Sequence, residues 1–165
     1  MKSKVSLALC LLVVLVVADW LSKYYFNANF HLYQSQQVIG ENFLRWTLVY
    51  NQGFSFSIGA NYPVLMRVLV GSFAVIVAIV LTYLAWKKLV TPSLPKPEKY
   101  TAWAFILVAS GAFGNGLERI FFGHVTDFIH FTFGTWSFAV FNLADIWINL
   151  GIYLLIYNLL FVRAK

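Results

Sequence analysis

The 165-residue sequence is 61% hydrophobic and only 11% charged. A soluble domain needs more polar residues to cover its surface, so this composition indicates an integral membrane protein, and the length leaves room for one domain covering residues 1–165. The formal net charge is +6, but the basic residues are spread over loops and ends instead of forming one patch, which argues against nucleic-acid binding.

Four apolar stretches are long enough to cross a membrane. A hydrocarbon layer about 30 Å thick requires about 20 helical residues, and candidates of that kind lie at residues 5–26, 64–86, 100–117 and 136–162. We therefore expect an all-α integral membrane protein built as a bundle of four transmembrane helices.

The first apolar stretch has an alternative interpretation as a cleavable signal. Lys2 and Lys4 precede it, and the letters LALC faintly resemble a lipid-attachment site at Cys10. We favour a membrane span, because Leu9 is bulky where such a site has a small residue. The apolar run also continues past Cys10 into aromatic residues typical of a membrane interface.

The basic residues indicate how the chain crosses the membrane. Cytoplasmic loops are enriched in lysine and arginine, and one side of the expected bundle carries most of these residues. They are Lys2, Lys4, Lys87, Lys88, Lys96, Lys99, Arg163 and Lys165. We therefore expect both termini in the cytoplasm and the loops 27–63 and 118–135 on the outer face.

The longer outer loop contains a β-strand pattern. Aromatic and branched residues alternate in part along the letters RWTLVYN, and the pattern stops at Gln52-Gly53. We expect a small sheet on the membrane surface, formed within the loop 27–63.

Four of the six acidic residues are expected near the outer face. At about 1.5 Å per helical residue, Asp145 should lie about 10 Å below Phe138, and Asp19 about 21 Å from the inner end of its span. Glu118 ends the third span, and Asp127 lies in the loop that follows. The acids therefore gather in one layer of the molecule.

Most polar groups in this layer have a structural interpretation. Asp19 and Lys23 are four residues apart, so they can form an ion pair that orients the first span. Glu118 beside Arg119 is expected to brace the end of the third span. Asparagines on the third and fourth spans can make ordinary interhelical hydrogen bonds. These are Asn115, Asn142 and Asn149.

Asp145 is harder to explain, because no basic residue lies within one helical turn of it. An isolated charged carboxylate in a membrane is costly, so we expect a partner from another segment, and Asp127 is the candidate. Two neighbouring carboxylates can hold one proton between them. The ionised acid can then activate water while the protonated acid hydrogen-bonds a peptide carbonyl, which suits peptide hydrolysis.

Five motifs, in this order along the chain, resemble those of the lipoprotein signal peptidases, also called type II signal peptidases. They are DWLSK (Asp19, Lys23), YNQGFSFSI (Asn51, Gly53), GNGLER (Gly114, Asn115, Arg119), VTDFIHF (Asp127) and FNLADIWINLG (Asn142, Ala144, Asp145). Each motif is weak alone, but five in order over nearly the whole chain are specific. Glu118 departs from the pattern, because the family usually has aspartate there.

The resemblance implies an aspartic endopeptidase of the bacterial inner membrane that removes signal peptides from prolipoproteins, cutting before a cysteine that carries diacylglycerol. In that family the acids matching Asp127 and Asp145 are the catalytic pair, and the outer loop forms a β-cradle. Other matching residues line or brace the site: Asn51, Gly53, Asn115, Arg119 and Asn142. The resemblance implies no cofactor, and we expect a monomer in contact with its substrates and with membrane lipids.

Other functions make different demands on the sequence. A small proton- or ion-coupled transporter would also bury acids, but it needs polar groups at several depths, whereas the inner halves of the later spans are almost purely apolar. A structural subunit would leave Asp127 and Asp145 without a reason to be acids. A metal site is not expected, because the single cysteine and three histidines lack ligand spacing.

Overall fold

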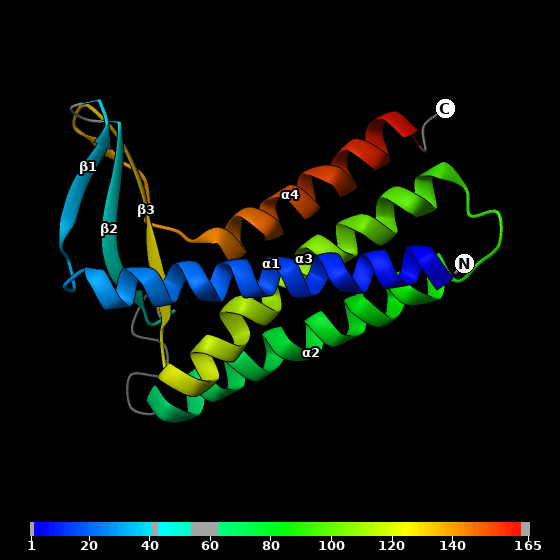
Figure 1. Cartoon of the computed structure of the whole chain (residues 1–165), viewed down its shortest axis with the longest axis horizontal. Coiled ribbons are helices and arrows are strands. Elements are labelled where there is room, and N and C mark those ends of the chain that lie inside the picture. The colour runs from blue at the N-terminus through cyan, green and yellow to red at the C-terminus, as the bar shows by residue number, and fades with distance from the viewer. Residues whose placement is uncertain (1, 41–42, 54–62, 163–165) are drawn as a thin grey trace.

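The computed structural model describes residues 2–40, 43–53 and 63–162. Four long helices form most of it, and a small sheet lies across one end of them (Figure 1). We call this end of the bundle the sheet end. The start of the first helix and the end of the last lie at the opposite end.

The helices are α1 (Lys2–Asn29), α2 (Pro63–Leu89), α3 (Lys96–Phe122) and α4 (Leu143–Tyr157), and a π-helical turn over Asn158–Val162 extends α4. Each of the four is long and apolar enough to cross a membrane. Many of their large apolar side chains are exposed, as a lipid-facing surface requires. The four predicted apolar stretches thus correspond to four helices.

The fourth helix begins at Leu143 and not at Trp136, so the predicted boundary was wrong. Asn142 is its N-cap, and the backbone N–H of Asp145 donates to the Asn142 side chain at 3.0 Å. The preceding segment is extended, because Phe141 exchanges backbone hydrogen bonds with Ile129 at 3.0 and 2.8 Å. An apolar run that pairs with a strand cannot also join the helix.

The sheet is antiparallel, with the order β1-β2-β3-β4. Its strands are β1 (Ser35–Ile39), β2 (Leu44–Asn51), β3 (Val125–Phe133) and β4 (Trp136–Ser137). The predicted strand in the first outer loop is therefore present as β2. The prediction placed the sheet within that loop alone, whereas β3 and β4 come from the segment after α3.

Helix α3 lies in the middle of the bundle and contacts each of the other three helices. Small residues permit this close packing. A Cβ atom at Gly111 would lie 2.2 Å from the carbonyl oxygen of Ala144, so only glycine allows α3 to approach the start of α4. Gly123, at φ 79°, then ends α3 in a left-handed conformation and turns the chain into β3.

Candidate active site

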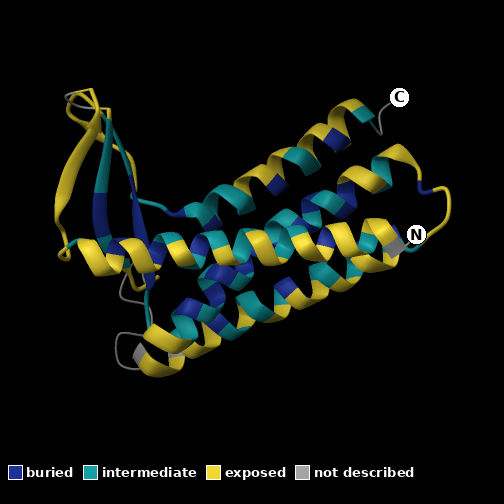
Figure 2. Ribbon diagram, viewed as in Figure 1, coloured by how far each residue is buried: buried dark blue, intermediate teal, exposed yellow. Residues whose placement is uncertain are grey.

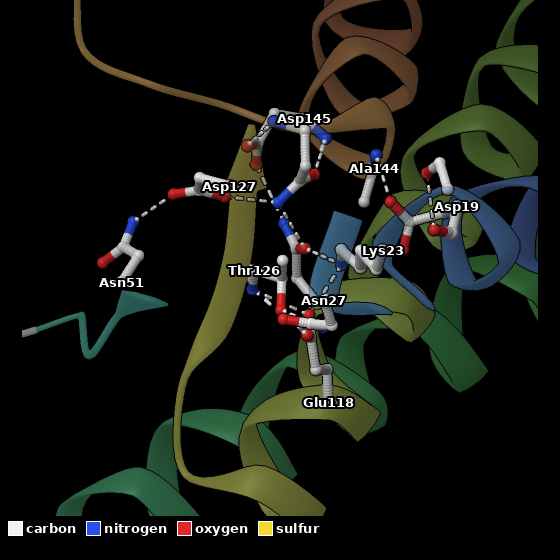
Figure 3. Close-up of polar contacts among 12 residues, drawn as sticks. Asp19, Lys23, Asn27, Asn51, Glu118, Thr126, Asp127, Ala144 and Asp145 are labelled. Atoms are coloured by element: carbon white, nitrogen blue, oxygen red, sulfur yellow. Dashed lines mark hydrogen bonds and ion pairs between the residues drawn. The ribbon is translucent and has the colours of Figure 1, made fainter. Parts of the chain in front are cut away.

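Polar side chains from α1, α3, α4, β2 and β3 meet at the sheet end of the bundle (Figure 3). A pocket of about 480 Å³ opens beside them. Asn51, Gly53, Arg119 and Asp127 line this pocket. The structure therefore brings together most of the residues that the sequence motifs single out.

Asp127 lies on β3 and is only 2% exposed. One carboxylate oxygen accepts a hydrogen bond from Asn51 Nδ2 at 3.0 Å, and the other accepts one from Asn142 Nδ2 at 2.6 Å. Asn51 is at the end of β2, which pairs with β3. Sheet pairing thus sets the position of this carboxylate.

Asp145 lies in the first turn of α4, and not well inside a helix as the sequence suggested. Its Oδ1 accepts from Asn115 Nδ2 at 2.8 Å, and its Oδ2 accepts from the backbone N–H of Asn142 at 3.1 Å. The positive end of the helix dipole also favours an acid at this position. The depth of position 145 in the membrane therefore does not by itself explain why an acid is present there.

Asn142 connects the two acids. Its Nδ2 donates to Asp127, and its backbone N–H donates to Asp145. The same Nδ2 also lies 3.1 Å from Asn115 Oδ1. No direct hydrogen bond between the two carboxylates is present in the described part of the chain. Hydrogen bonds from asparagine residues therefore fix the position of each acid relative to the other.

Burial raises the pKa of Asp127 to about 7. Loss of water around the carboxylate is the largest cause, and the negative charge of Asp145 acts in the same direction. The hydrogen bonds from Asn51 and Asn142 lower the pKa but do not offset burial. Near neutral pH, Asp127 can therefore both hold and release a proton.

Lys23 is buried beneath this pair of acids. Its Nζ lies 2.8 Å from Asp19 and 2.9 Å from Glu118, and it donates to Asn115 Oδ1 at 2.8 Å. The predicted ion pair between Asp19 and Lys23 is therefore present. Because Lys23 occupies the Asn115 oxygen, the Asn115 amide nitrogen faces Asp145.

Glu118 forms its ion pair with Lys23 of α1, and its charge also acts on the adjacent Arg119. Its carboxylate also accepts from the backbone N–H of Thr126 at 3.1 Å and from the Thr126 hydroxyl at 2.5 Å. Thr126 directly precedes Asp127. Glu118 therefore ties the end of α3 to α1 and to the strand that carries the acid.

Arg119 approaches the pocket from α3 and interacts electrostatically with Asp127 and Asp145. Gly53 lies against its guanidinium group, where an added Cβ would be 3.0 Å from Nη2. Gly53 also has φ 76°, and its N–H donates to Asn51 Oδ1 at 2.9 Å. Glycine therefore satisfies both the backbone conformation and the close contact.

Some contacts in this region were not anticipated from the sequence. Asn27 donates to the Thr126 hydroxyl at 3.1 Å, and the backbone N–H of Ala144 donates to Asp19 at 2.9 Å. Neither contact has a local spacing signal, because its partners lie on different elements. Conversely, Asn149 is exposed and bonds only its own helix, through the Asp145 carbonyl, among the described contacts.

Among the described residues, no group of three or more histidine, cysteine, aspartate or glutamate side chains could hold a metal ion. The chemistry that the site offers is that of two carboxylates, with asparagine amides that orient them and one arginine nearby.

Comparison with known proteins identifies a family. A family model described as signal peptidase (SPase) II matches residues 11–161. A curated lipoprotein signal peptidase from Francisella tularensis subsp. novicida is 36% identical over 156 residues, covering 94% of this chain and 92% of the relative. Another from Pseudomonas syringae pv. tomato is 39% identical over 145 residues, covering 87% of this chain and 79% of the relative.

Solved structures agree with this result. A bacterial membrane enzyme solved at 1.9 Å resolution has a TM-score of 0.72 and 25% identity, with 94% of each chain covered. A second, solved at 2.3 Å resolution, has a TM-score of 0.70 over 94% of this chain and 88% of the other. Since the family model spans most of the sequence and the relatives match along nearly all of it, the chain belongs to the signal peptidase II family.

Proposed function

We propose that this chain removes signal peptides from bacterial prolipoproteins as an aspartic endopeptidase, with Asp127 and Asp145 as the catalytic pair. The family supplies the reaction class, and the relatives are named as lipoprotein signal peptidases. The observation that carries the aspartic mechanism is the bridge through Asn142, which binds both carboxylates beside a pocket.

The two acids take different roles in this mechanism. The pair holds one proton, and the raised pKa of Asp127 favours placing that proton there. Asp127 then donates a hydrogen bond to the carbonyl oxygen of the scissile peptide. Asp145 accepts a proton from water, whose oxygen forms a bond to the carbonyl carbon. As the C–N bond breaks, Asp145 passes the proton that it took from water to the amide nitrogen, and the pair is left with its single shared proton.

The remaining site residues orient these groups. Asn51, Asn115 and Asn142 direct amide N–H groups at the carboxylates. Arg119 supplies positive charge at the pocket, and Gly53 leaves room for it. Beneath them Asp19, Lys23 and Glu118 form a structural ion-pair group that joins α1 to α3.

The substrate and the location follow from this function. The peptide to be cut precedes a cysteine bearing diacylglycerol in the outer leaflet, so the sheet end faces outward across the bacterial inner membrane. Both termini are then cytoplasmic, in agreement with the distribution of basic residues. We propose that the chain acts as a single-domain monomer surrounded by lipid, without a cofactor.

Single substitutions of the acids test this function. Asparagine has nearly the shape of aspartate but can neither ionise nor carry the shared proton, so Asp127→Asn and Asp145→Asn should each reduce cleavage about 10³-fold. The assay is mass spectrometry of a lipidated prolipoprotein incubated with purified enzyme. Glu98→Gln, an acid at the opposite end of α3, is the matched control and should keep wild-type activity. Unreduced cleavage by either aspartate variant would overturn the mechanism.

A further inference from the structure

The sheet has two chemically different faces. On one face, polar side chains form a hydrogen-bonded row across all four strands. Arg45 Nε donates to Ser35 Oγ at 2.8 Å, and Ser35 Oγ lies 2.8 Å from Thr47 Oγ1. Thr47 Oγ1 lies 3.0 Å from His130 Nδ1, and His130 Nε2 lies 2.7 Å from Ser137 Oγ. This polar face is suited to water.

The other face is apolar. Leu44 pairs with Phe131, and Phe133 pairs with Trp136, so these residues alternate with the polar row. Where the sheet crosses the helix ends, this face packs against Phe26 of α1 and against the first turn of α4. The apolar face is therefore turned toward the helices, and so toward the membrane that they span.

Six aromatic side chains continue this face, from the turn before β2, from β3 and β4, and from the segment that leads into α4. Figure 1 shows that the sheet reaches past the helices on the side of this segment. Neighbouring rings are in contact, with centroids 5.3 to 6.0 Å apart. Figure 2 shows buried residues in β2 and β3 beside α1, whereas β1 and the far end of the sheet are mostly exposed. We call the group the aromatic tip. It consists of Phe43, Phe131, Phe133, Trp136, Phe138 and Phe141.

Four of these rings are largely uncovered by the protein: Phe43 is 42% exposed, Phe133 51%, Trp136 56% and Phe138 48%. A contiguous exposed aromatic patch of this kind indicates a binding surface. Trp136 suits the headgroup region of a bilayer, because its ring is apolar and its indole N–H is polar. The phenylalanine rings are purely apolar and suit the boundary between headgroups and acyl chains, as on the apolar face of interfacial helices.

We propose that the aromatic tip inserts into the lipid leaflet at the sheet end, as an interfacial anchor separate from the four spans. Two observations favour lipid over a protein partner. The tip lies on the face of the sheet that packs against the helix ends, and the opposite face carries the hydrogen-bonded polar row. An amphipathic sheet in this position has its apolar face in lipid and its polar face in water.

The insertion has a consequence for the active site. Phe141 belongs to the aromatic tip and directly precedes Asn142, which binds both carboxylates. Anchoring the tip therefore sets the height of the acids relative to the headgroups. A substrate held by its own lipid presents its peptide at a defined height in the same leaflet.

Depth-dependent fluorescence quenching tests the insertion. In the full chain with Cys10→Ser, a single cysteine introduced by Phe133→Cys carries an environment-sensitive fluorophore. Gln37→Cys is the matched control, because Gln37 pairs with Arg45 and so belongs to the polar face. The proteins are reconstituted in vesicles of phosphatidylethanolamine and phosphatidylglycerol with brominated acyl chains.

Brominated lipid should quench the label at position 133 several-fold more than the label at 37, and aqueous iodide should show the opposite order. Equal quenching by lipid at both positions, or greater iodide quenching at 133, would overturn the proposal. Trp136→Cys gives a second label in the aromatic tip and should behave like position 133. The measurement needs no cleavage, so its failure is distinguishable from failure of the proposed function.

Discussion

The two ends of the helical bundle are held together by different contacts. At the sheet end, Lys23 is 3% exposed and contacts Asp19, Glu118 and Asn115 on two helices. Each of these contacts has a required direction and distance. The arrangement therefore specifies where side chains point as well as how closely the helices approach.

At the opposite end, the buried residues are mostly small and apolar. Ala8, Ala85, Ala102 and Ile106 form one cluster there. Such packing is not directional and tolerates changes that keep the volume. Directional contacts are therefore concentrated at the end where the proposed chemistry requires fixed carboxylates, whereas packing at the other end mainly holds the helices together.

Removing the cation at the sheet end should have the largest effect on stability. Lys23→Met leaves two buried carboxylates without their partner, which should cost about 3–5 kcal/mol of unfolding free energy. Lys88→Met, which breaks the partly exposed ion pair with Glu98 at the opposite end, should cost less than about 1 kcal/mol. Thermal and denaturant unfolding in detergent micelles measure both. Equal losses of unfolding free energy in the two variants would contradict the difference proposed between the two ends of the bundle.

Asparagines at the two ends provide a matched test of activity. Asn142→Ser keeps a residue suited to the N-cap of α4 but removes the amide that donates to Asp127, so cleavage should fall about 10²-fold. Asn158→Ser changes an equally buried asparagine that bonds Pro97 and Thr101. That variant should cleave at nearly the wild-type rate. Reversal of this order in a steady-state cleavage assay would contradict the assignment of the site.

The pH dependence should report on Asp127. Because its pKa is raised to about 7, kcat/KM should decline as pH rises through about 7 and the shared proton is lost. The same shift affects stability. A carboxyl group that binds its proton more tightly when folded stabilises the protein below its ordinary pKa of 3.8, and this contribution is lost as pH rises through about 7.

Asp127→Asn should therefore weaken the fall in melting temperature between about pH 4 and about pH 7. Glu98→Gln should leave that part of the curve as in the wild type. If Asp127→Asn and the wild type showed the same dependence of melting temperature on pH, a group other than Asp127 would be responsible for it.

Shortening the Glu118 side chain by one methylene should have the smallest effect on activity. Glu118→Asp keeps the charge that faces Lys23 and, with a small shift of the chain, the contact with Thr126. We expect cleavage within about three-fold of wild type, because the variant keeps these contacts. Losing such a hydrogen bond outright would cost about 1–3 kcal/mol, and the shorter side chain should lose only a small part of that. Loss of turnover in a protein of unchanged stability would indicate that Glu118 takes part in the reaction itself.

The sequence predicts the parts of this molecule that depend on local signals. Span length and hydrophobicity locate the helices, and the four-residue spacing of Asp19 and Lys23 predicts their ion pair. The start of α4 could not be read in this way, because the apolar residues before Asn142 fit a strand as well as a helix. The correct choice depends on pairing with β3, which local sequence does not encode.

The same limit applies within the site. Glu118 and Arg119 are adjacent in sequence, but Lys23, on another helix, is the partner of Glu118. Motif resemblance correctly identified which residues gather, since Asn51, Asn142 and Asp127 do meet. It did not identify the backbone and threonine contacts that position them, because these arise only when distant elements pack.

The most direct test of the central claim is whether Asp127 and Asp145 act as one catalytic unit. Cleavage rates of a lipidated prolipoprotein are measured for the purified Asp127→Asn, Asp145→Asn and double-variant proteins, each free of wild-type enzyme. Members of one unit are not additive, so the double variant should be little slower than the slower single variant. A double variant whose loss equals the product of the two single losses, or a single variant with substantial activity, would contradict the account.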